Sequence, residues 1–494
     1  MMQKSVPAGH GALHLNALTL GIANAIDYGI QFILPIVLTR VLDPHAFGQY
    51  RLLWLMISTV MALAPLAMPT SLYYYLPRSD DRSKRLFINQ ALLFLVVTGA
   101  IGAAAGSAVN PWLPAAMREI SAHDSWVPVF IWLWVVASLI DFLPTAEERV
   151  QWQSRAIVGL SATRALMLTL TAMTTHSFFA LVIALAAFAA LRLALLLRYI
   201  SRYHGFGGPW LNRNEFASQI RYALPFGVSG ALYSLRVQAD QWVAAMLFSV
   251  NRFAAFSVGS VLSPVLYLFR QSVNNAFLPS MNRLHAQGDV IGAVKLNNRA
   301  NISVALLAYP LLGFCFVFAE QVITLIYTAP YVDAAAVMRV YTFGLLAYAV
   351  ELSSIMLINR QGTFVMLVNL ASLVFSAAGS YLGALKFGLA GAAAGSVFGI
   401  YLERCATLMR ISSLIGIPIR DLQDWRSLCL IAVAAAISGT VSWILKGYIS
   451  GSGAIAQLAL GAVIFTSAYV VLLLAFGFGE AFVNLARLVA KRGG

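Results

Sequence analysis

Acidic residues are scarce in this chain of 494 residues. It has 19 Asp and Glu against 33 Lys and Arg, and its formal net charge is +14. Charged residues make up 11% of the chain, whereas a soluble globular domain has about 25%, so an ordinary water-soluble protein is excluded. Cysteine is also rare. Cys315, Cys405 and Cys429 lie in apolar runs without metal-ligand spacing, and we interpret them as packing residues.

Catalytic and nucleotide-binding motifs are missing as well. The seven histidines are scattered, and no HExxH or other metal-ligand spacing occurs. No P-loop is present, so the chain has no ATPase of its own. The longest external loop that we predict, residues 108–125, has no catalytic arrangement of side chains. The sequence therefore predicts no enzyme activity, no metal and no cofactor.

Hydrophobic residues, in contrast, make up 60% of the chain, and the mean hydropathy is +0.78. The apolar runs are too long for barrel strands, which have about ten alternating residues. The sequence predicts an all-α polytopic membrane protein with about 14 transmembrane helices. The predicted spans are 15–39, 47–72, 86–107, 126–145, 157–175, 178–198, 223–248, 253–277, 300–320, 338–357, 363–384, 388–409, 427–446 and 455–477.

The basic residues are distributed unevenly between these spans. With the N-terminus in the cytoplasm, most Lys and Arg fall in cytoplasmic segments, as the positive-inside rule requires. The clusters Arg78 to Arg85, Arg198 to Arg221 and Arg487 to Arg492 all lie on this side. We therefore predict that both termini are cytoplasmic. The membrane, rather than a nucleic-acid partner, explains the positive charge.

A hydrophobic hairpin at residues 222–280 carries charges near the middle of its limbs. Arg236 and Asp240 lie one helical turn apart with Tyr233 on the same face, and the second limb repeats this arrangement with Tyr267 and Arg270. A charge at mid-bilayer costs at least about 2.5–3.5 kcal/mol, so it should face protein or a water-filled cavity. Arg236 and Asp240 either neutralise each other within the helix or line a charged lumen, where several guanidinium groups would suit a pyrophosphate or an acidic sugar.

The first hairpin is a counterpart of this one. Asp27 lies in a polar stripe on the first span, and Arg51 lies on the second span, where it either faces the lumen or snorkels to the interface. Pro65 and Pro69 favour a kink in the same span. An intramembrane carboxylate can bind a coupling proton or sodium ion, and Asp27 and Asp240 are the best placed.

The two hairpins indicate an internal duplication. The turn Phe47–Tyr50 matches the turn Phe253–Phe256, and six spans separate the copies, so both have the same orientation in the membrane. We expect two parallel-repeat six-helix lobes plus a C-terminal helix pair. Their bounds are 1–200 for the N-terminal lobe, 201–219 for a cytoplasmic linker, 220–410 for the C-terminal lobe and 411–494 for the helix pair and tail.

Other polar and small residues have simpler interpretations. Arg192 lies near the end of a span, and we expect it to snorkel to the interface. Glu351 and the pair Glu403–Arg404 are either gate or lobe-contact residues or packing between helices, and we favour packing. A stripe of Gly391, Gly395 and Gly399 predicts close helix packing.

Three segments resemble bacterial polysaccharide flippases of the multidrug/oligosaccharidyl-lipid/polysaccharide exporter superfamily. Leu38–Tyr50 (LTRVLDPHAFGQY) is similar to the first-hairpin turn of that family. Gln321–Tyr331 (QVITLIYTAPY) resembles its segment between spans nine and ten, and Lys386–Gly395 (KFGLAGAAAG) resembles its turn between spans eleven and twelve. The resemblance extends over residues 15–410.

The resemblance implies a function in the bacterial inner membrane. It implies a flippase that moves undecaprenyl-pyrophosphate-linked oligosaccharide from the cytoplasmic to the periplasmic leaflet by alternating access, with membrane lipid and polysaccharide polymerase or export proteins as partners. The cavity would be lined by spans one, two, seven and eight, and the helix pair can provide a groove for the polyprenyl tail. The expected substrate-binding residues are Arg236, Arg270, Arg51, Asp27, Asp240, Tyr233 and Tyr267.

Three alternatives remain open from the sequence. A cation-coupled multidrug exporter and a lipid II flippase belong to the same superfamily. A membrane glycan polymerase or ligase belongs to a different class, and the short external loops disfavour it.

Overall fold

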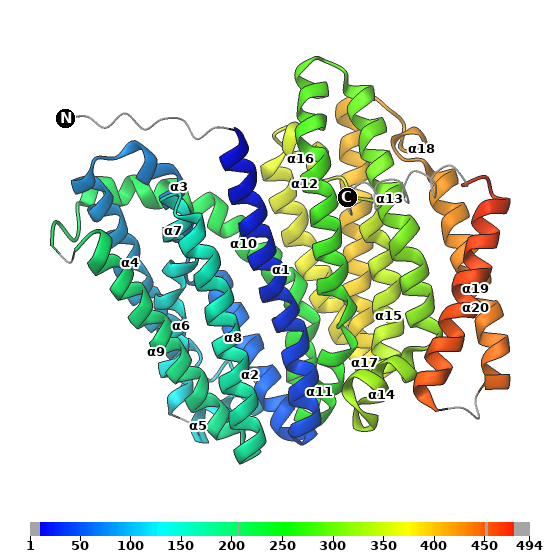
Figure 1. Ribbon diagram of the computed structural model, residues 1–494, viewed down its shortest axis with the longest axis horizontal. Coiled ribbons are helices and arrows are strands. Elements are labelled where there is room, and N and C mark those ends of the chain that lie inside the picture. Colours follow the sequence, from blue (N-terminus) through cyan, green and yellow to red (C-terminus); the bar gives the residue numbers. More distant parts are fainter. Residues whose placement is uncertain (1–9, 124, 206, 450–452, 479–494) are drawn as a thin grey trace. The chain divides into compact units, whose positions relative to one another are not determined.

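The computed structural model describes residues 10–123, 125–205, 207–449 and 453–478. The described elements are all helices, which confirms the all-α membrane fold (Figure 1). They form two compact units. The N-terminal unit runs to Gln238 and includes Phe248–Ala254, and the C-terminal unit comprises Ala239–Leu247 and the chain from Ala255 onward.

The N-terminal unit is built mainly of long helices and has an apolar core of its own. Its helices are α1 (His10–Val41), α2 (Pro44–Leu63), α3 (Met68–Tyr75), α4 (Asp81–Ala105), α5 (Ala115–His123), α6 (Trp126–Ala137), α7 (Leu143–Ala146), α8 (Val150–Thr175) and α9 (Phe178–Tyr203), with 3₁₀ turns η1 (Leu76–Arg78) and η2 (Ser138–Asp141). Two further helices, α10 (Arg213–Leu247) and α11 (Val250–Gly259), contribute segments to both units.

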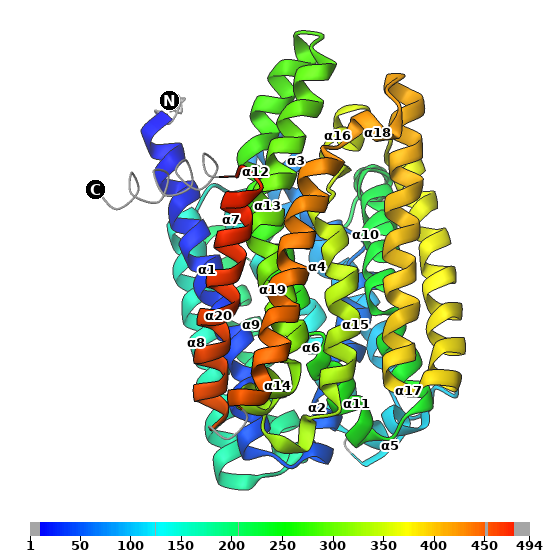
Figure 2. The ribbon, with the colours of Figure 1, turned by 90° about the vertical axis from the view of Figure 1, so that its right-hand side faces the viewer.

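The C-terminal unit has its own core, centred on α13 and α19. Its helices are α12 (Leu262–Ala286), α13 (Val290–Val317), α14 (Ala319–Tyr327), α15 (Ala334–Leu346), α16 (Ser353–Ile358), α17 (Gly362–Ile415), α18 (Ile419–Leu422), α19 (Trp425–Ile449) and α20 (Ala454–Ala475), with 3₁₀ turns η3 (Ala329–Tyr331) and η4 (Ala347–Ala349). The pair α19 and α20 packs side by side (Figure 2).

Eleven helices of the described chain are long and apolar enough to cross a membrane. One of them, α17, has 54 residues and reverses within its length, and the shorter segment Ala334–Ala349 is also apolar. The number of crossings, expected to be about 14, and the side of each terminus stay predictions. The basic cluster Arg487 to Arg492 lies outside the described residues.

The predicted kink at the two prolines is present. Helix α2 ends at Leu63 and α3 begins at Met68, just before Pro69. Leu66 and Ala67 between them have positive φ values of 42° and 56°. The prolines therefore end one helix and start another instead of bending a continuous one.

The predicted turn between spans eleven and twelve lies at Gly388, where φ is 63° and ψ is −140°. Glycine adopts this conformation without the steric penalty of a Cβ. The two halves of α17 then touch through small residues. A Cβ on Gly395 would overlap the backbone of Gly379, and a Cβ on Gly399 would lie 3.0 Å from the Cβ of Ser376. The close packing predicted from the glycine stripe is confirmed.

Substituting Gly395 by Val tests this contact. We expect a lower Tm of the purified protein in detergent, because overpacking costs about 1–3 kcal/mol and the backbone of Gly379 cannot move away easily. The control is Gly159→Val in α8, where nothing lies within 4 Å of the added Cβ. Equal Tm values for the two variants would contradict this packing.

The side chain of Glu147 links the turn between α7 and α8 to the end of α9. Its carboxylate accepts a hydrogen bond from the Tyr199 hydroxyl and lies 2.6 Å from His204 Nε2. Arg149 adds an ion pair at 3.6 Å and lies 3.5 Å from the centroid of the Tyr203 ring. Burial raises the pKa of Glu147, but the hydrogen bonds from His204 and Tyr199 and the charges of His204 and Arg149 together lower that pKa below its ordinary value.

The lowered pKa of Glu147 predicts a pH-dependent stability. The ionised carboxylate contributes stability that is fully present above its unfolded-state pKa and is lost as the pH falls through its folded-state pKa. We expect Glu147→Gln to lower the Tm at neutral pH, and this difference should shrink toward about pH 3–4. Thermal unfolding of both proteins across this range measures it. A difference that stays constant would contradict the role of the charge.

Candidate functional site

A polar cavity of about 350 Å³ lies inside the N-terminal unit. Its walls are formed by α1, α2, α6, α8, α9 and η2. Two carboxylates, two guanidinium groups and several amides meet in it. Its polar lining residues with amide, hydroxyl or charged groups are Asn24, Asp27, Gln31, Asp141, Gln153, Ser161, Arg164 and Arg192.

Asp27, predicted as a site residue, lies in this cavity. It accepts a hydrogen bond of 2.7 Å from Gln31 Nε2, one turn further along α1, and another from the Ser161 hydroxyl of α8. The Arg164 guanidinium lies 3.7 Å from the same carboxylate. The polar stripe of the first span therefore faces the interior of its own unit, where α8 supplies partners.

Arg192 forms the second charge pair of the cavity. Its guanidinium lies 2.6 Å from Asp141 and 4.5 Å from the centroid of the Trp134 ring. The residue is 6% exposed, so the prediction that it snorkels to the interface is wrong. Asp141 is the last residue of η2, the 3₁₀ turn after α6, and a carboxylate near the end of the predicted span 126–145 is the only sequence signal that could have indicated a buried partner.

Asp240 on α10 is buried in the C-terminal unit. Its carboxylate accepts a hydrogen bond of 2.6 Å from the Tyr341 hydroxyl of α15 and one of 2.8 Å from the backbone N–H of Gln241. Both donors are neutral groups. Sequence reasoning missed Tyr341, because one tyrosine in an apolar helix is usually a packing or interface residue.

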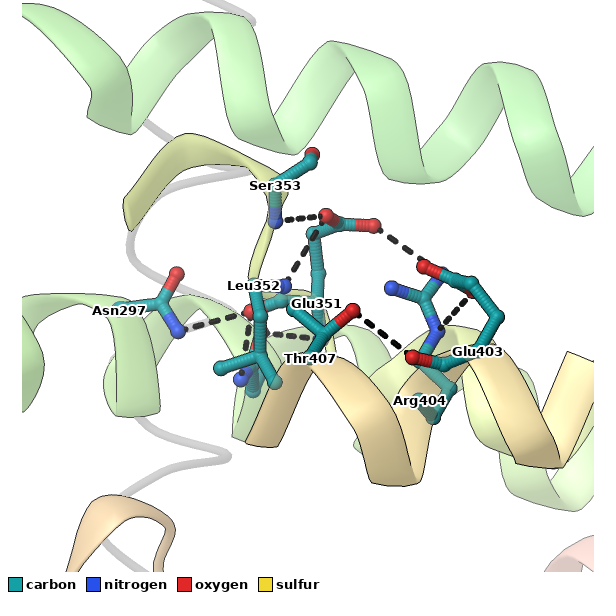
Figure 3. Close-up of polar contacts among 8 residues, drawn as sticks. Asn297, Glu351, Leu352, Ser353, Glu403, Arg404 and Thr407 are labelled. Atoms are coloured by element: carbon teal, nitrogen blue, oxygen red, sulfur yellow. Dashed lines mark hydrogen bonds and ion pairs between the residues drawn. The ribbon is translucent and has the colours of Figure 1, made fainter. Parts of the chain in front are cut away.

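A break in the predicted tenth span contains Glu351. After η4 the chain is irregular at residues 350–352, and α16 begins at Ser353. The backbone carbonyl of Glu351 accepts hydrogen bonds from Asn297 at 2.9 Å and from Asn301 at 3.4 Å, and its carboxylate accepts one of 2.5 Å from the N–H of Ser353 (Figure 3). Buried amide side chains of α13 therefore replace the hydrogen bonds that the helix lacks here.

Two arginines accompany this glutamate. Arg404 of α17 lies 3.4 Å from the Glu351 carboxylate and 3.6 Å from that of Glu403 (Figure 3). Arg270 of α12, a predicted site residue, is 3% exposed, and none of its three guanidinium nitrogens has a hydrogen-bond partner. Glu351 and Arg404 both act on it electrostatically. We call Glu351, Glu403, Arg404 and Arg270 the Glu351 cluster. It contains two buried guanidinium groups, and that of Arg270 has no hydrogen-bond partner.

The remaining predicted site residues lie on both units. Arg51 of α2 is half-buried. Arg236 of α10 is buried, and its guanidinium lies 5.2 Å from the centroid of the Tyr233 ring on the same helix. Tyr267 of α12 is exposed. Their gathering around one central cavity stays a prediction.

An apolar groove of about 670 Å³ lies between α13, α15 and α19 of the C-terminal unit. Exposed rings of Phe316, Phe343 and Trp443 line it. Arg339 is also in its lining and lies 2.9 Å from Glu320. Helix α19, which belongs to the predicted C-terminal helix pair, thus helps to form a groove suited to a hydrocarbon chain.

Comparison with known proteins identifies the family. A sequence profile described as "Polysaccharide biosynthesis protein" matches residues 13–285, more than half of the chain. The chain belongs to this family. No curated protein sequence matches it.

Solved structures share the fold of this chain at low sequence identity. The lipid II flippase MurJ in an inward closed conformation aligns with a TM-score of 0.68 at 12% identity, over 94% of this chain and 100% of MurJ. An inward-facing multidrug resistance MATE family transporter of the MOP superfamily aligns with a TM-score of 0.59 at 13% identity, over 81% of this chain and 99% of the transporter.

A variant of the Vibrio cholerae MATE transporter VcmN is similar as well, with a TM-score of 0.55 at 12% identity over 83% of this chain and 97% of VcmN. The fold is therefore one that flippases and multidrug transporters of the MOP superfamily share. Together with the family match, this confirms the resemblance predicted from the three sequence segments.

The Glu351 cluster predicts a large effect of a small substitution. Glu351→Gln removes the charge that faces Arg404 and Arg270, so we expect a loss of about 3–5 kcal/mol in unfolding free energy, as for other buried pairs deprived of one partner. Unfolding in a mild detergent series measures this loss.

The control is Glu320→Gln. It removes the partner of Arg339 in an exposed pair, and such pairs contribute only about 0–1 kcal/mol. Equal losses of unfolding free energy in the two variants would show that the buried cluster contributes no more to stability than the exposed pair does.

Proposed function

We propose that this protein is a flippase that moves undecaprenyl-pyrophosphate-linked oligosaccharide repeat units across the bacterial inner membrane, for the synthesis of an exopolysaccharide, O-antigen or capsule. Membership of the polysaccharide biosynthesis family supports the glycan substrate. The fold shared with a lipid flippase and with exporters supports transport rather than catalysis. Polysaccharide polymerase and export proteins are the expected partners.

The observation that carries this proposal is the buried guanidinium of Arg270, which has no hydrogen-bond partner. A guanidinium without a hydrogen-bond partner at membrane depth is costly, unless its interactions are completed in another state of the protein. A pyrophosphate offers oxygens in the geometry that a guanidinium binds bidentately. In the proposed mechanism Arg270, together with Arg236 and Arg51, holds the anionic head group while the lobes alternate between inward and outward states.

The lipid tail and the coupling ion have separate proposed places. The apolar groove of α13, α15 and α19 suits the polyprenyl tail, because it is lined by exposed aromatic rings at the surface of apolar helices. Asp240 is the preferred carrier of a coupling proton, since its hydrogen-bond donors are neutral. Asp27, the second residue predicted for a coupling ion, is less favourable, because a cation there would have to displace the Arg164 guanidinium.

Flipping can be measured directly in proteoliposomes. They are loaded with a lipid-pyrophosphate-linked oligosaccharide, and an impermeant glycosidase reports its exposure, with and without an ion gradient. We expect exposure that depends on the protein, and a rate at least about tenfold lower in Arg270→Gln, because hydrogen bonds to charged groups contribute about 1.5–3 kcal/mol each.

Arg283→Gln is the matched control on the same helix. Its side chain is exposed and donates a local hydrogen bond to Ser280, so the rate should not change. Transport by Arg270→Gln at the wild-type rate and at normal protein levels would refute the assignment. Pumping of a cationic dye without any flipping would favour a multidrug exporter, and glycan product formed by the purified protein would favour a polymerase.

A further inference from the structure

The polar cavity of the N-terminal unit contains buried groups whose hydrogen-bonding capacity is unused. Gln153 is 2% exposed, and its amide donates a bond of 3.3 Å to the backbone carbonyl of Asp141, but its Oε1 accepts none. The buried Nε of Arg164 donates none. Both side chains line the cavity. An acceptor and a donor are thus left open in one place, and such groups are costly unless a bound molecule satisfies them.

The cavity has no net charge to attract an ion. The Asp27 and Asp141 carboxylates face the Arg164 and Arg192 guanidinium groups, at 3.7 Å and 2.6 Å respectively. A phosphate would have to displace a carboxylate, and a cation would have to displace an arginine. The complementary ligand is therefore neutral and has both hydroxyl donors and hydroxyl acceptors.

Aromatic walls complete the cavity. The rings of Trp54 and Trp134 lie edge to face with centroids 5.3 Å apart, and Phe188 lines the same space. A volume of about 350 Å³ is far larger than one water requires and falls in the range of small-molecule sites. Aromatic side chains beside polar groups match a pyranose, which has C–H faces and a rim of hydroxyls.

We propose that this cavity binds one neutral sugar residue of the transported glycan, with Gln153 accepting from a hydroxyl and Arg164 donating to one. The assignment rests on the proposed flippase function. In this assignment the N-terminal unit recognises the sugar, whereas arginines outside this cavity bind the pyrophosphate of the head group.

Binding of free sugars to the full chain in nanodiscs tests the site. Saturation-transfer NMR with methyl glucoside, methyl galactoside and the methyl glycoside of N-acetylglucosamine detects weak binding, and cyclohexylmethanol serves as an apolar ring of similar size. We expect at least one glycoside to bind and cyclohexylmethanol not to compete. Gln153→Leu should weaken binding by about tenfold, the effect of one lost hydrogen bond that leaves its partner unsatisfied.

Two further variants distinguish loss of the site from misfolding of the protein. Ala156→Leu keeps every polar group and places a larger side chain in the cavity lining, so it should abolish binding while keeping a strong helix former in α8. The matched control is Gln321→Leu, which removes another amide with a buried, unpartnered Oε1, but in the C-terminal unit. It should bind as the wild type does.

The outcomes separate the site from the function. If no glycoside binds, or if cyclohexylmethanol competes equally, or if Gln153→Leu and Ala156→Leu bind as the wild type does, the sugar site is overturned. In that case protein-dependent flipping in proteoliposomes would still support the flippase. Glycoside binding that is lost in Ala156→Leu, in a protein that flips no lipid, would uphold the site and refute the flippase instead.

Discussion

A charge or a free backbone group inside a hydrocarbon layer has to find its partner within the protein, and the polar organisation of this chain follows from that constraint. In the N-terminal unit, Asp27 and Arg192 reach partners on other helices. In the C-terminal unit, Asp240 reaches Tyr341, and Glu351 reaches Arg404. Because lipid is as apolar as leucine, hydrophobic burial does not favour one helix arrangement over another within the membrane. The hydrogen bonds and ion pairs between helices provide that specificity.

The two units meet the constraint differently, although the sequence indicates that they are copies of one design. The N-terminal cavity balances its carboxylates with guanidinium groups. The C-terminal unit keeps Arg270 buried without a bonded partner. Under the proposed function, the charge-balanced cavity binds a neutral sugar and the unpaired guanidinium of Arg270 binds the anionic head group.

Sequence reasoning succeeded where a physical signal is local. Hydropathy predicted the helices, Pro65 and Pro69 marked a break, and the glycine stripe marked the folding back of α17. It failed where partners are distant in the chain: Arg192 was expected at the interface, yet Asp141 from another helix holds it in the interior.

The tenth span was predicted as continuous, because no proline or glycine marks its break at Glu351. The residues that stabilise the break, Asn297 and Asn301, precede it by about 50 positions in the chain. That spacing also affects the biogenesis of the protein. Helix α13 is synthesised before residues 350–352, so the amides that donate to the Glu351 carbonyl precede it in the order of membrane insertion. An irregular segment is unstable in lipid by itself. Here the helix that supplies its hydrogen-bond partners is inserted first, and this order allows the segment to enter the membrane.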